Sequence, residues 1–293
     1  MKGVLVDLTK CIGCGSCSVA CKLYNDNKWV EDRAETGGPR AQLCDANWTV
    51  VRQVKLDKDL NALPLSEKKV DAVSGATDSS NQVWRFVKTQ CFHCAEPACV
   101  ASCFAKALQK DENGATVYYP NSCVGCRYCM LACPFHTPKF EWEKPLPRIT
   151  KCMFCSGRLK KGESPACVSV CPTNVMKYGD RDELLQEAKQ IIAKSSGRYV
   201  EHVYGEEEVG GTAWIYISDV PFEQLGFRVM EPKNPNSYPL PRKALPHWTE
   251  PYMHWTPILG GIWGVVLAGL YIITRRNKVA AEKNASSQPA ANG

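Results

Sequence analysis

The sequence predicts an α+β fold made of two cysteine-rich units and one C-terminal transmembrane helix. Three observations lead to this prediction. Sixteen of the 17 cysteines fall into four groups of four between residues 11 and 171. Short strand-like and helix-like runs, such as residues 3–8, flank these groups. Near the C-terminus, residues 257–274 form a mainly apolar stretch without a charge.

The clearest cysteine group is Cys123-Val-Gly-Cys126-Arg-Tyr-Cys129-Met-Leu-Ala-Cys133-Pro134. It reads C-x2-C-x2-C-x3-C-P, the spacing of bacterial ferredoxins that bind [4Fe–4S] clusters. The short intervals let successive thiolates turn inward around one small inorganic core, and Gly125 leaves room for the backbone to approach that core. The fourth cysteine of such a run usually binds a second cluster, so this motif predicts a partner motif.

Three further groups can serve as partner motifs. In chain order they are Cys11, Cys14, Cys17 and Cys21; Cys91, Cys94, Cys99 and Cys103; and Cys152, Cys155, Cys167 and Cys171. Four such groups predict four [4Fe–4S] clusters in two ferredoxin-like units. Only Cys44 is left over, and we expect it to be an inert thiol.

Zinc sites and disulfides are the alternatives for these cysteines. Zinc sites also use C-x2-C pairs, but they need only four ligands around a tetrahedral ion, and the third and fourth cysteines of each group fit a cluster better. Cysteine makes up about 6% of the residues, below the roughly 8–10% of disulfide scaffolds. The chain is also long enough to bury a core without disulfides.

The first ferredoxin-like unit is expected to comprise residues 1–90 together with 150–230, which hold the first and fourth motifs and insertions. Residues 3–8 and 48–55 have the composition of strands. Residues 57–82 are charged and rich in turn residues, so we expect an insertion there.

The second ferredoxin-like unit is expected to be residues 91–149, which hold the second and third motifs. Residues 115–120 predict a short strand after the Asn113-Gly114 turn signal. The order of strand, cysteine group, short helix and loop recurs along the chain, which indicates duplicated units.

Residues 180–196 carry the strongest helix signal. Asp180 and Glu183 have the spacing of a capping box, and Leu184 begins an apolar face with a helical period. Residues 199–218 predict a β-hairpin.

Composition excludes some functions. The formal net charge is +6, but clusters bound by four thiolates are anionic, so we expect the excess Lys and Arg to offset them in part. No aromatic–basic motif of a nucleic-acid-binding module is present. The five histidines are scattered without a catalytic constellation, and His93, inside the second motif, is a candidate hydrogen-bond donor to a cluster.

The C-terminal part of the chain predicts a membrane anchor. Residues 231–256 are polar and proline-rich and predict an extended linker. Residues 257–274 predict a transmembrane helix, with Trp255 and Tyr271 placed for the interfaces. The alternative is a buried helix of a soluble protein. Residues 275–293 predict a disordered tail.

Charge predicts the orientation of this anchor. Four basic residues follow the span and two precede it within about twenty residues; they are Arg275, Arg276, Lys278 and Lys283, and Arg242 and Lys243. The positive-inside rule therefore predicts a single-pass inner-membrane protein with a cytoplasmic tail and a periplasmic cluster domain.

These features together resemble the iron–sulfur (beta) subunit of membrane-bound respiratory formate dehydrogenases. The four cysteine groups, the segment after the fourth group and the C-terminal span carry the resemblance, which covers nearly the whole chain. It implies an electron-transfer subunit that is not catalytic alone. Electrons would pass from a molybdenum or tungsten (alpha) subunit through four [4Fe–4S] clusters to a membrane cytochrome b (gamma) subunit and quinone.

In that family the first and fourth motifs exchange their fourth cysteines, and so do the second and third motifs. The resemblance implies four ligand sets. Set A is Cys11, Cys14, Cys17 and Cys171; set B is Cys152, Cys155, Cys167 and Cys21; set C is Cys91, Cys94, Cys99 and Cys133; set D is Cys123, Cys126, Cys129 and Cys103.

Two other functions remain open. The cysteine groups are shared by subunits of nickel–iron hydrogenases and of other molybdopterin oxidoreductases, and a structural zinc-binding anchor protein belongs to a different class. No export signal precedes the first motif, which favours the formate dehydrogenase type, exported with a signal-bearing catalytic subunit.

Overall fold

The structure is a computed structural model. It describes residues 1–29, 37–38, 41–57, 83–195 and 197–286. The insertion predicted over 57–82 lies, apart from its first residue, outside these ranges. The chain divides into two units, Met1–Pro246 and His247–Gly293.

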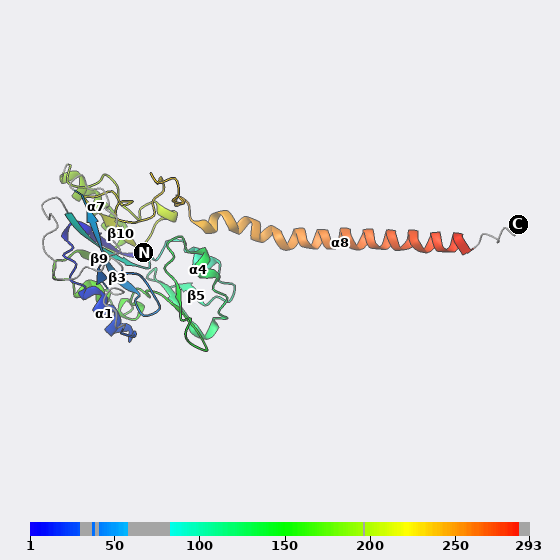
Figure 1. Cartoon of the computed structure of the whole chain (residues 1–293), viewed down its shortest axis with the longest axis horizontal. Helices are drawn as coiled ribbons and strands as arrows, with labels where there is room; N and C mark the ends of the chain where they lie inside the picture. The colour runs from blue at the N-terminus through cyan, green and yellow to red at the C-terminus, as the bar shows by residue number, and fades with distance from the viewer. Residues whose placement is uncertain (30–36, 39–40, 58–82, 196, 287–293) are drawn as a thin grey trace, which may run out of the picture. The chain divides into compact units, whose positions relative to one another are not determined.

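Strand β1 (Lys2–Asp7) is the middle strand of a three-stranded sheet with the order β10–β1–β9, and Figure 1 labels the two outer strands. β10 (Trp214–Ile217) pairs with it in parallel and β9 (Met176–Asp180) pairs antiparallel. The strand predicted over residues 3–8 is therefore confirmed, with a shift of one residue. This pairing brings the segment before the first motif next to segments that follow the fourth motif.

The two faces of this sheet bury different side chains because successive residues of a strand point to opposite sides. Val4 packs with Trp214 in the largest hydrophobic cluster. Leu5 packs with Leu184 in a second cluster, and Leu184 belongs to α7 (Arg181–Lys194). The apolar side of α7 therefore covers one face of the sheet, and Cys17 of the first motif and Cys167 of the fourth motif belong to the cluster on the other face.

Helix α7 confirms the helix predicted over residues 180–196, but the predicted capping box does not form. Asp180 occupies the N-cap position without a side-chain capping bond. Its carboxylate instead accepts a hydrogen bond from Lys2 Nζ at 3.1 Å. Asp180 is also the last residue of β9 and lies opposite Lys2 in the sheet, so the strand register takes its side chain away from the helix end.

A second sheet contains the antiparallel hairpin of β3 (Thr49–Leu56) and β4 (Val83–Gln90), with Thr49 opposite Gln90. The two-residue β2 (Gly37–Gly38) pairs in parallel with β3. β3 confirms the strand predicted over 48–55, shifted by one residue. β4 was not predicted, because buried polar residues near its end obscure the pattern of a strand.

The remaining elements of the first unit are short. They are η1 (Leu8–Lys10), α1 (Ser16–Asn25), α3 (Ala98–Ala101), β5 (Leu108–Lys110), β6 (Thr116–Tyr118), η3 (Pro120–Ser122), α4 (Tyr128–Ala132), β7 (Lys139–Phe140), β8 (Ile149–Thr150), α5 (Ser156–Leu159), α6 (Ala166–Ser169) and η4 (Glu208–Gly210). β5 pairs with β6 and β7 pairs with β8, both antiparallel. β6 lies within the strand predicted over 115–120.

The predicted second unit, residues 91–149, has a small cluster largely of its own, formed by Cys99, Leu108, Cys129, Phe140 and Ile149. The whole of Met1–Pro246 is nevertheless one compact unit. The division of this unit into two ferredoxin-like parts stays a prediction.

The hairpin predicted over residues 199–218 is reduced to one antiparallel bridge. Tyr204 and Tyr216 exchange both backbone hydrogen bonds, at 3.0 and 2.9 Å. No regular ladder extends from this pair; β10 pairs with β1, and η4 lies in the turn between the two predicted arms.

Helix α8 (Leu245–Ser286) contains the predicted span 257–274. It is the one helix of the described chain that is long and apolar enough to cross a membrane, and its apolar window is 0% buried. Two predictions need correction. The linker predicted over 231–256 becomes helical at Leu245, and the tail predicted to be disordered over 275–293 is helical as far as Ser286. A helix that is already nucleated extends into its flanks at little cost, since each added residue contributes a further hydrogen bond.

Candidate iron–sulfur cluster sites

All four cysteine motifs place their third cysteine at the same point of a short helix. Cys17, Cys99, Cys129 and Cys167 are each the second residue of α1, α3, α4 and α6. Each of these thiols is buried. The repeated sequence order is therefore also a repeated local structure.

The residue before the second cysteine of every motif has a left-handed backbone. It is Gly13 (φ 72°), His93 (φ 49°), Gly125 (φ 69°) or Phe154 (φ 55°). This conformation costs a non-glycine residue about 1–2 kcal/mol. At Gly13 the requirement is also steric, because a Cβ would lie 2.4 Å from Phe86 Cδ1.

This turn directs a backbone amide at the first sulfur of a motif. Gly125 N donates to Cys123 Sγ at 3.4 Å, and Phe154 N donates to Cys152 Sγ at the same distance. Elsewhere Ala107 N donates to Cys103 Sγ at 3.2 Å. Hydrogen bonds of this kind favour the thiolate, which is the form that binds metal.

One cavity gathers cysteines of the first and fourth motifs. Its lining contains the set A residues Cys11, Cys14, Cys17 and Cys171, which come from both ends of a 160-residue stretch. The parallel and antiparallel partners of β1 bring these two motifs together. Lys88, Val51 and Met176 line the same cavity.

A second cavity gathers cysteines of the second and third motifs. Its lining contains the set D residues Cys103, Cys123, Cys126 and Cys129, together with Tyr118 and Ile149. Cys103 follows α3 and the other three cysteines surround the start of α4. In both cavities the fourth cysteine therefore comes from the other motif of the pair.

The set B thiols lie close enough to affect one another's ionisation. Burial raises the pKa of Cys152, and Cys21, Cys155 and Cys167 raise it further. Burial, followed by Cys167, raises the pKa of Cys21 to about 12. The structure thus brings Cys21 of the first motif to the three cysteines of the fourth motif.

The set C thiols interact in the same way. Burial raises the pKa of Cys94 well above its ordinary value, and Cys133, Cys91 and Cys99 raise it further. Cys91 also raises the pKa of Cys152, so sets B and C are neighbours. Cys14 of set A and Cys126 of set D are the two exposed cysteines of the motifs, which leaves sets B and C on the inside.

The donor chemistry fits an iron–sulfur cluster. Each set offers four cysteine sulfurs, the ligands of [4Fe–4S] clusters. Burial disfavours the charged thiolates, and the positive charge of bound iron would offset that cost. One buried polar atom also lacks a partner. His93 is 0% exposed, its Nδ1 accepts from Thr116 N at 2.9 Å, and its Nε2 has no partner. A buried N–H without a protein partner, one residue before Cys94, fits the role expected for His93.

A single zinc ion fits the geometry less well. Within the described ranges, no three His, Cys, Asp or Glu side chains are grouped as one metal ion would require. Four thiolates around zinc would each lie about 2.3 Å from one centre. A polynuclear core holds its ligands farther apart.

Known proteins share these motifs. Residues 82–181 match the family model described as a 4Fe-4S dicluster domain, and residues 2–23 match a 4Fe-4S binding domain. A protein of Nitratidesulfovibrio vulgaris is 38% identical over 290 residues, which are 97% of this chain and 70% of the relative.

Two relatives have informative names. The hydrogenase-2 operon protein HybA of Escherichia coli O157:H7 is 31% identical over 249 residues, 76% of this chain and 71% of HybA. The nitrate-inducible formate dehydrogenase iron–sulfur subunit of Escherichia coli K12 is 33% identical over 222 residues, 73% of this chain and 66% of the relative. The chain belongs to this family of iron–sulfur electron-transfer subunits.

The iron–sulfur subunit therefore binds multiple 4Fe–4S clusters, and it transfers electrons rather than catalysing a reaction alone. The zinc alternative is set aside by the two matching 4Fe–4S domain models. Cys44, outside the motifs, is half-buried.

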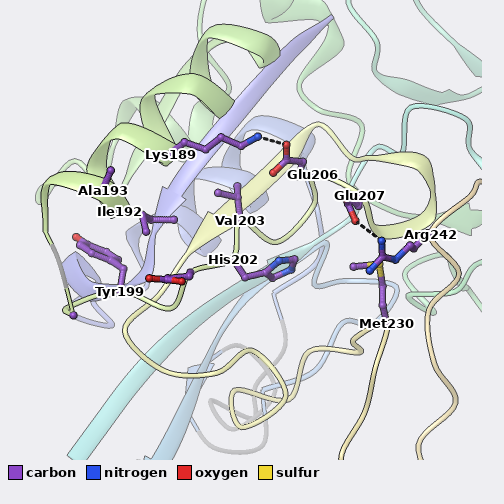
Figure 2. A pocket seen from close by; sticks show the side chains of 12 residues that line it. Lys189, Ile192, Ala193, Tyr199, His202, Val203, Glu206, Glu207, Met230 and Arg242 are labelled. Atoms are coloured by element: carbon purple, nitrogen blue, oxygen red, sulfur yellow. Dashed lines mark hydrogen bonds and ion pairs between the residues drawn. The ribbon is translucent and has the colours of Figure 1, made fainter.

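An open cavity away from the cysteine sites lies elsewhere in the iron–sulfur subunit. It holds about 500 Å³, and no cysteine is among its described lining residues. Figure 2 shows Lys189 directed at Glu206 and Arg242 at Glu207, so these cations are already paired. Next to it, His202 Nε2 lies 2.7 Å from Glu208 Oε1, and this hydrogen bond raises the pKa of His202.

Sequence reasoning missed Lys88 in this iron–sulfur subunit. Lys88 is 2% exposed and lines the set A cavity. The available signal was its position three residues before Cys91, at the end of a strand that runs into the second motif. From the sequence alone, a lysine at this position is expected on the surface. Only the packing of β4 shows that Lys88 is buried.

Proposed function

We propose that this chain is the iron–sulfur (beta) subunit of a membrane-bound respiratory formate dehydrogenase. It would carry electrons from a molybdenum or tungsten catalytic subunit to a membrane cytochrome b and quinone. The relatives named as formate dehydrogenase iron–sulfur subunits, at 30–33% identity, support this proposal.

Sets A, B, C and D are proposed as the ligands of four [4Fe–4S] clusters. Each cluster, when bound, accepts and releases one electron. The observation that carries the proposal is the gathering of cysteines from paired motifs, with Cys171 beside Cys11 and Cys103 beside Cys129. The electrostatic influence of Cys91 of set C on Cys152 of set B supports a continuous series of four sites.

The remaining residues serve these sites by excluding water and holding the sulfurs. Phe92 stacks on Phe135 with ring centroids 4.2 Å apart, and both lie next to cysteines of set C. Such apolar surroundings and the backbone donors to sulfur are the means by which a protein adjusts cluster potentials.

A hydrogenase subunit is the second candidate, because HybA matches a larger share of this chain than the formate dehydrogenase subunit does. A native gel of mildly solubilised membranes separates the two. The band recognised by an antibody to this chain would be stained for viologen reduction with formate and then with hydrogen. Formate-dependent staining supports the first proposal, hydrogen-dependent staining supports the second, and staining with neither contradicts both.

Iron and acid-labile sulfide analysis tests the clusters themselves. We expect both elements in the purified complex at the level of four clusters for each copy of this chain. Zinc without sulfide would overturn the cluster assignment.

We also propose that residues 257–274 span the inner membrane, with the cluster domain in the periplasm and the tail in the cytoplasm. The exposed apolar surface of α8 and the basic residues after it support this orientation. Protease added to spheroplasts should digest the cluster domain while the inner membrane is intact. Digestion only after lysis would contradict the orientation.

A further inference from the structure

Lys88 places an ammonium group inside the protein among neutral partners. Its Nζ donates to Thr49 Oγ1 at 3.1 Å and to Gln90 Oε1 at 2.7 Å. It also lies 4.1 Å from the centre of the Trp214 ring. These contacts satisfy the hydrogens of the ammonium, but none of them supplies a negative charge.

Within the part of the chain that the structure describes, no carboxylate neutralises this charge. Among the described residues, Lys88 takes part in no ion pair with Asp or Glu. Burial of an unpaired ammonium is strongly unfavourable unless another anion lies nearby. The fold keeps this charge at 2% exposure, so a counter-charge is to be expected.

Cysteines of sets A and B are the groups placed to supply it. Lys88 lines the cavity of set A together with Cys11 and Cys17. Burial lowers the pKa of Lys88, but charge on Cys167 of set B and Cys17 of set A outweighs burial, and the net pKa is raised. Trp214, over whose ring Lys88 lies, packs with Cys17 of set A and Cys167 of set B in one hydrophobic cluster.

We propose that Lys88 is the shared counter-charge of sets A and B, and that it raises the reduction potentials of the two clusters these sets would hold. The inference rests on the proposed function, in which the sets are cluster ligands. Reduction of a cluster adds one electron and moves no proton to or from Lys88. A fixed positive charge beside the site therefore stabilises the reduced state relative to the oxidised state.

The test is a redox titration of the purified complex, with dithionite as the electron donor and the reduced clusters followed by EPR. Lys88→Met keeps the length of the side chain and removes the charge. At a fixed potential near the midpoints, the ratio of reduced to oxidised cluster should fall about tenfold for two of the four clusters, which is about 59 mV for a one-electron couple. The other two clusters should move much less.

Lys55→Met is the matched control. Lys55 lies on the same hairpin over the ring of Trp84, at 5.9 Å from its centre. It lines neither of the two cysteine cavities described above. Its replacement removes a lysine–tryptophan contact of the same kind and should leave all four potentials unchanged.

A second variant tests the effect of Lys88 on the two potentials if Lys88→Met does not assemble into the complex. Gln90→Glu keeps Lys88 and places a carboxylate 2.7 Å from the ammonium, where the amide oxygen now lies. The same two potentials should fall. Unchanged potentials, or equal shifts of all four, in a variant with full iron and sulfide content would overturn the role of Lys88. Absence of iron and sulfide from the wild-type complex would instead overturn the proposed function.

Discussion

The His93 ring stacks on the Phe154 ring, with centroids 4.8 Å apart and planes inclined by 22°. The two residues hold equivalent places in the second and fourth motifs, one before the second cysteine, and both have left-handed backbones. The other two motifs have glycine at this place. Both rings are fully buried. Their packing offsets the cost of the two left-handed turns, and it holds the second motif, which contributes to set C, next to the fourth motif, which contributes to set B.

His93→Phe tests the hydrogen bonds of this ring separately from its packing. Phenylalanine already occupies the equivalent place at residue 154, so the turn and the stacking should persist. The amide of Thr116 would lose its buried acceptor, which should cost about 1–3 kcal/mol of unfolding free energy. Denaturant unfolding followed by cluster absorbance measures this loss. Phe154→Tyr, which removes no hydrogen-bond partner, is a control for disturbance of the stack, and equal stability of His93→Phe and the wild type would contradict the role of Nδ1.

The crossing of the motifs predicts which cysteine replacements are equivalent. Cys171→Ser and Cys14→Ser should alter the same EPR signal, because both sulfurs line the set A cavity. The double variant should lose no more iron than either single variant, since one site is already damaged. Cys155→Ser, in the same motif as Cys171, should alter a different signal. If Cys171→Ser matches Cys155→Ser instead, the fourth cysteines are not exchanged.

The His202–Glu208 pair predicts a pH-dependent contribution to stability. The hydrogen bond to Glu208 raises the pKa of His202 above its ordinary value of about 6.5. A raised pKa means that the stabilisation is complete below the unfolded-state pKa and is lost as the pH rises through the folded-state pKa. His202 is partly exposed, so solvent screens the effect.

Glu208→Gln should therefore reduce Tm more at about pH 6 than at about pH 8.5. In the wild type, Gly205 N donates a hydrogen bond to Glu208 Oε2 at 2.7 Å. The side-chain oxygen of glutamine can still accept this hydrogen bond. Thermal unfolding of both proteins across this range gives the comparison. A Tm difference that grows with pH would have the wrong sign for this pair.

Gly205 is a position where the fold leaves no room for a side chain. Its φ is 92°, and a Cβ would lie 2.4 Å from Thr212 Oγ1 and 2.6 Å from the carbonyl oxygen of Trp214. Gly205→Ala should lower the unfolding free energy by more than the roughly 1–2 kcal/mol of a left-handed backbone alone. Gly162→Ala is the matched control, because Gly162 has φ 76° and nothing within 4 Å of its Cβ position. Equal losses of unfolding free energy in the two variants would contradict a steric penalty at Gly205.

The spacing of residues close together in the sequence was enough to predict the cluster motifs and several secondary-structure elements. The intervals between cysteines predicted cluster motifs, and the fold repeats one turn and one short helix at each of them because these features depend on only a few consecutive residues. The strand at residues 3–8, the helix that ends near Lys194 and the apolar segment 257–274 were predicted for the same reason: each has a period or a composition that its own residues define.

Only the tertiary structure decided the relationships between distant segments. The pairing of β1 with β10 and β9 brings Cys171 beside Cys11, and strand register takes Asp180 from its expected cap to Lys2. Packing also buries Lys88, which no local pattern distinguishes from a surface lysine. Such contacts depend on which surfaces pack together after the chain folds. The spacing of residues that are near one another in the sequence does not determine that packing.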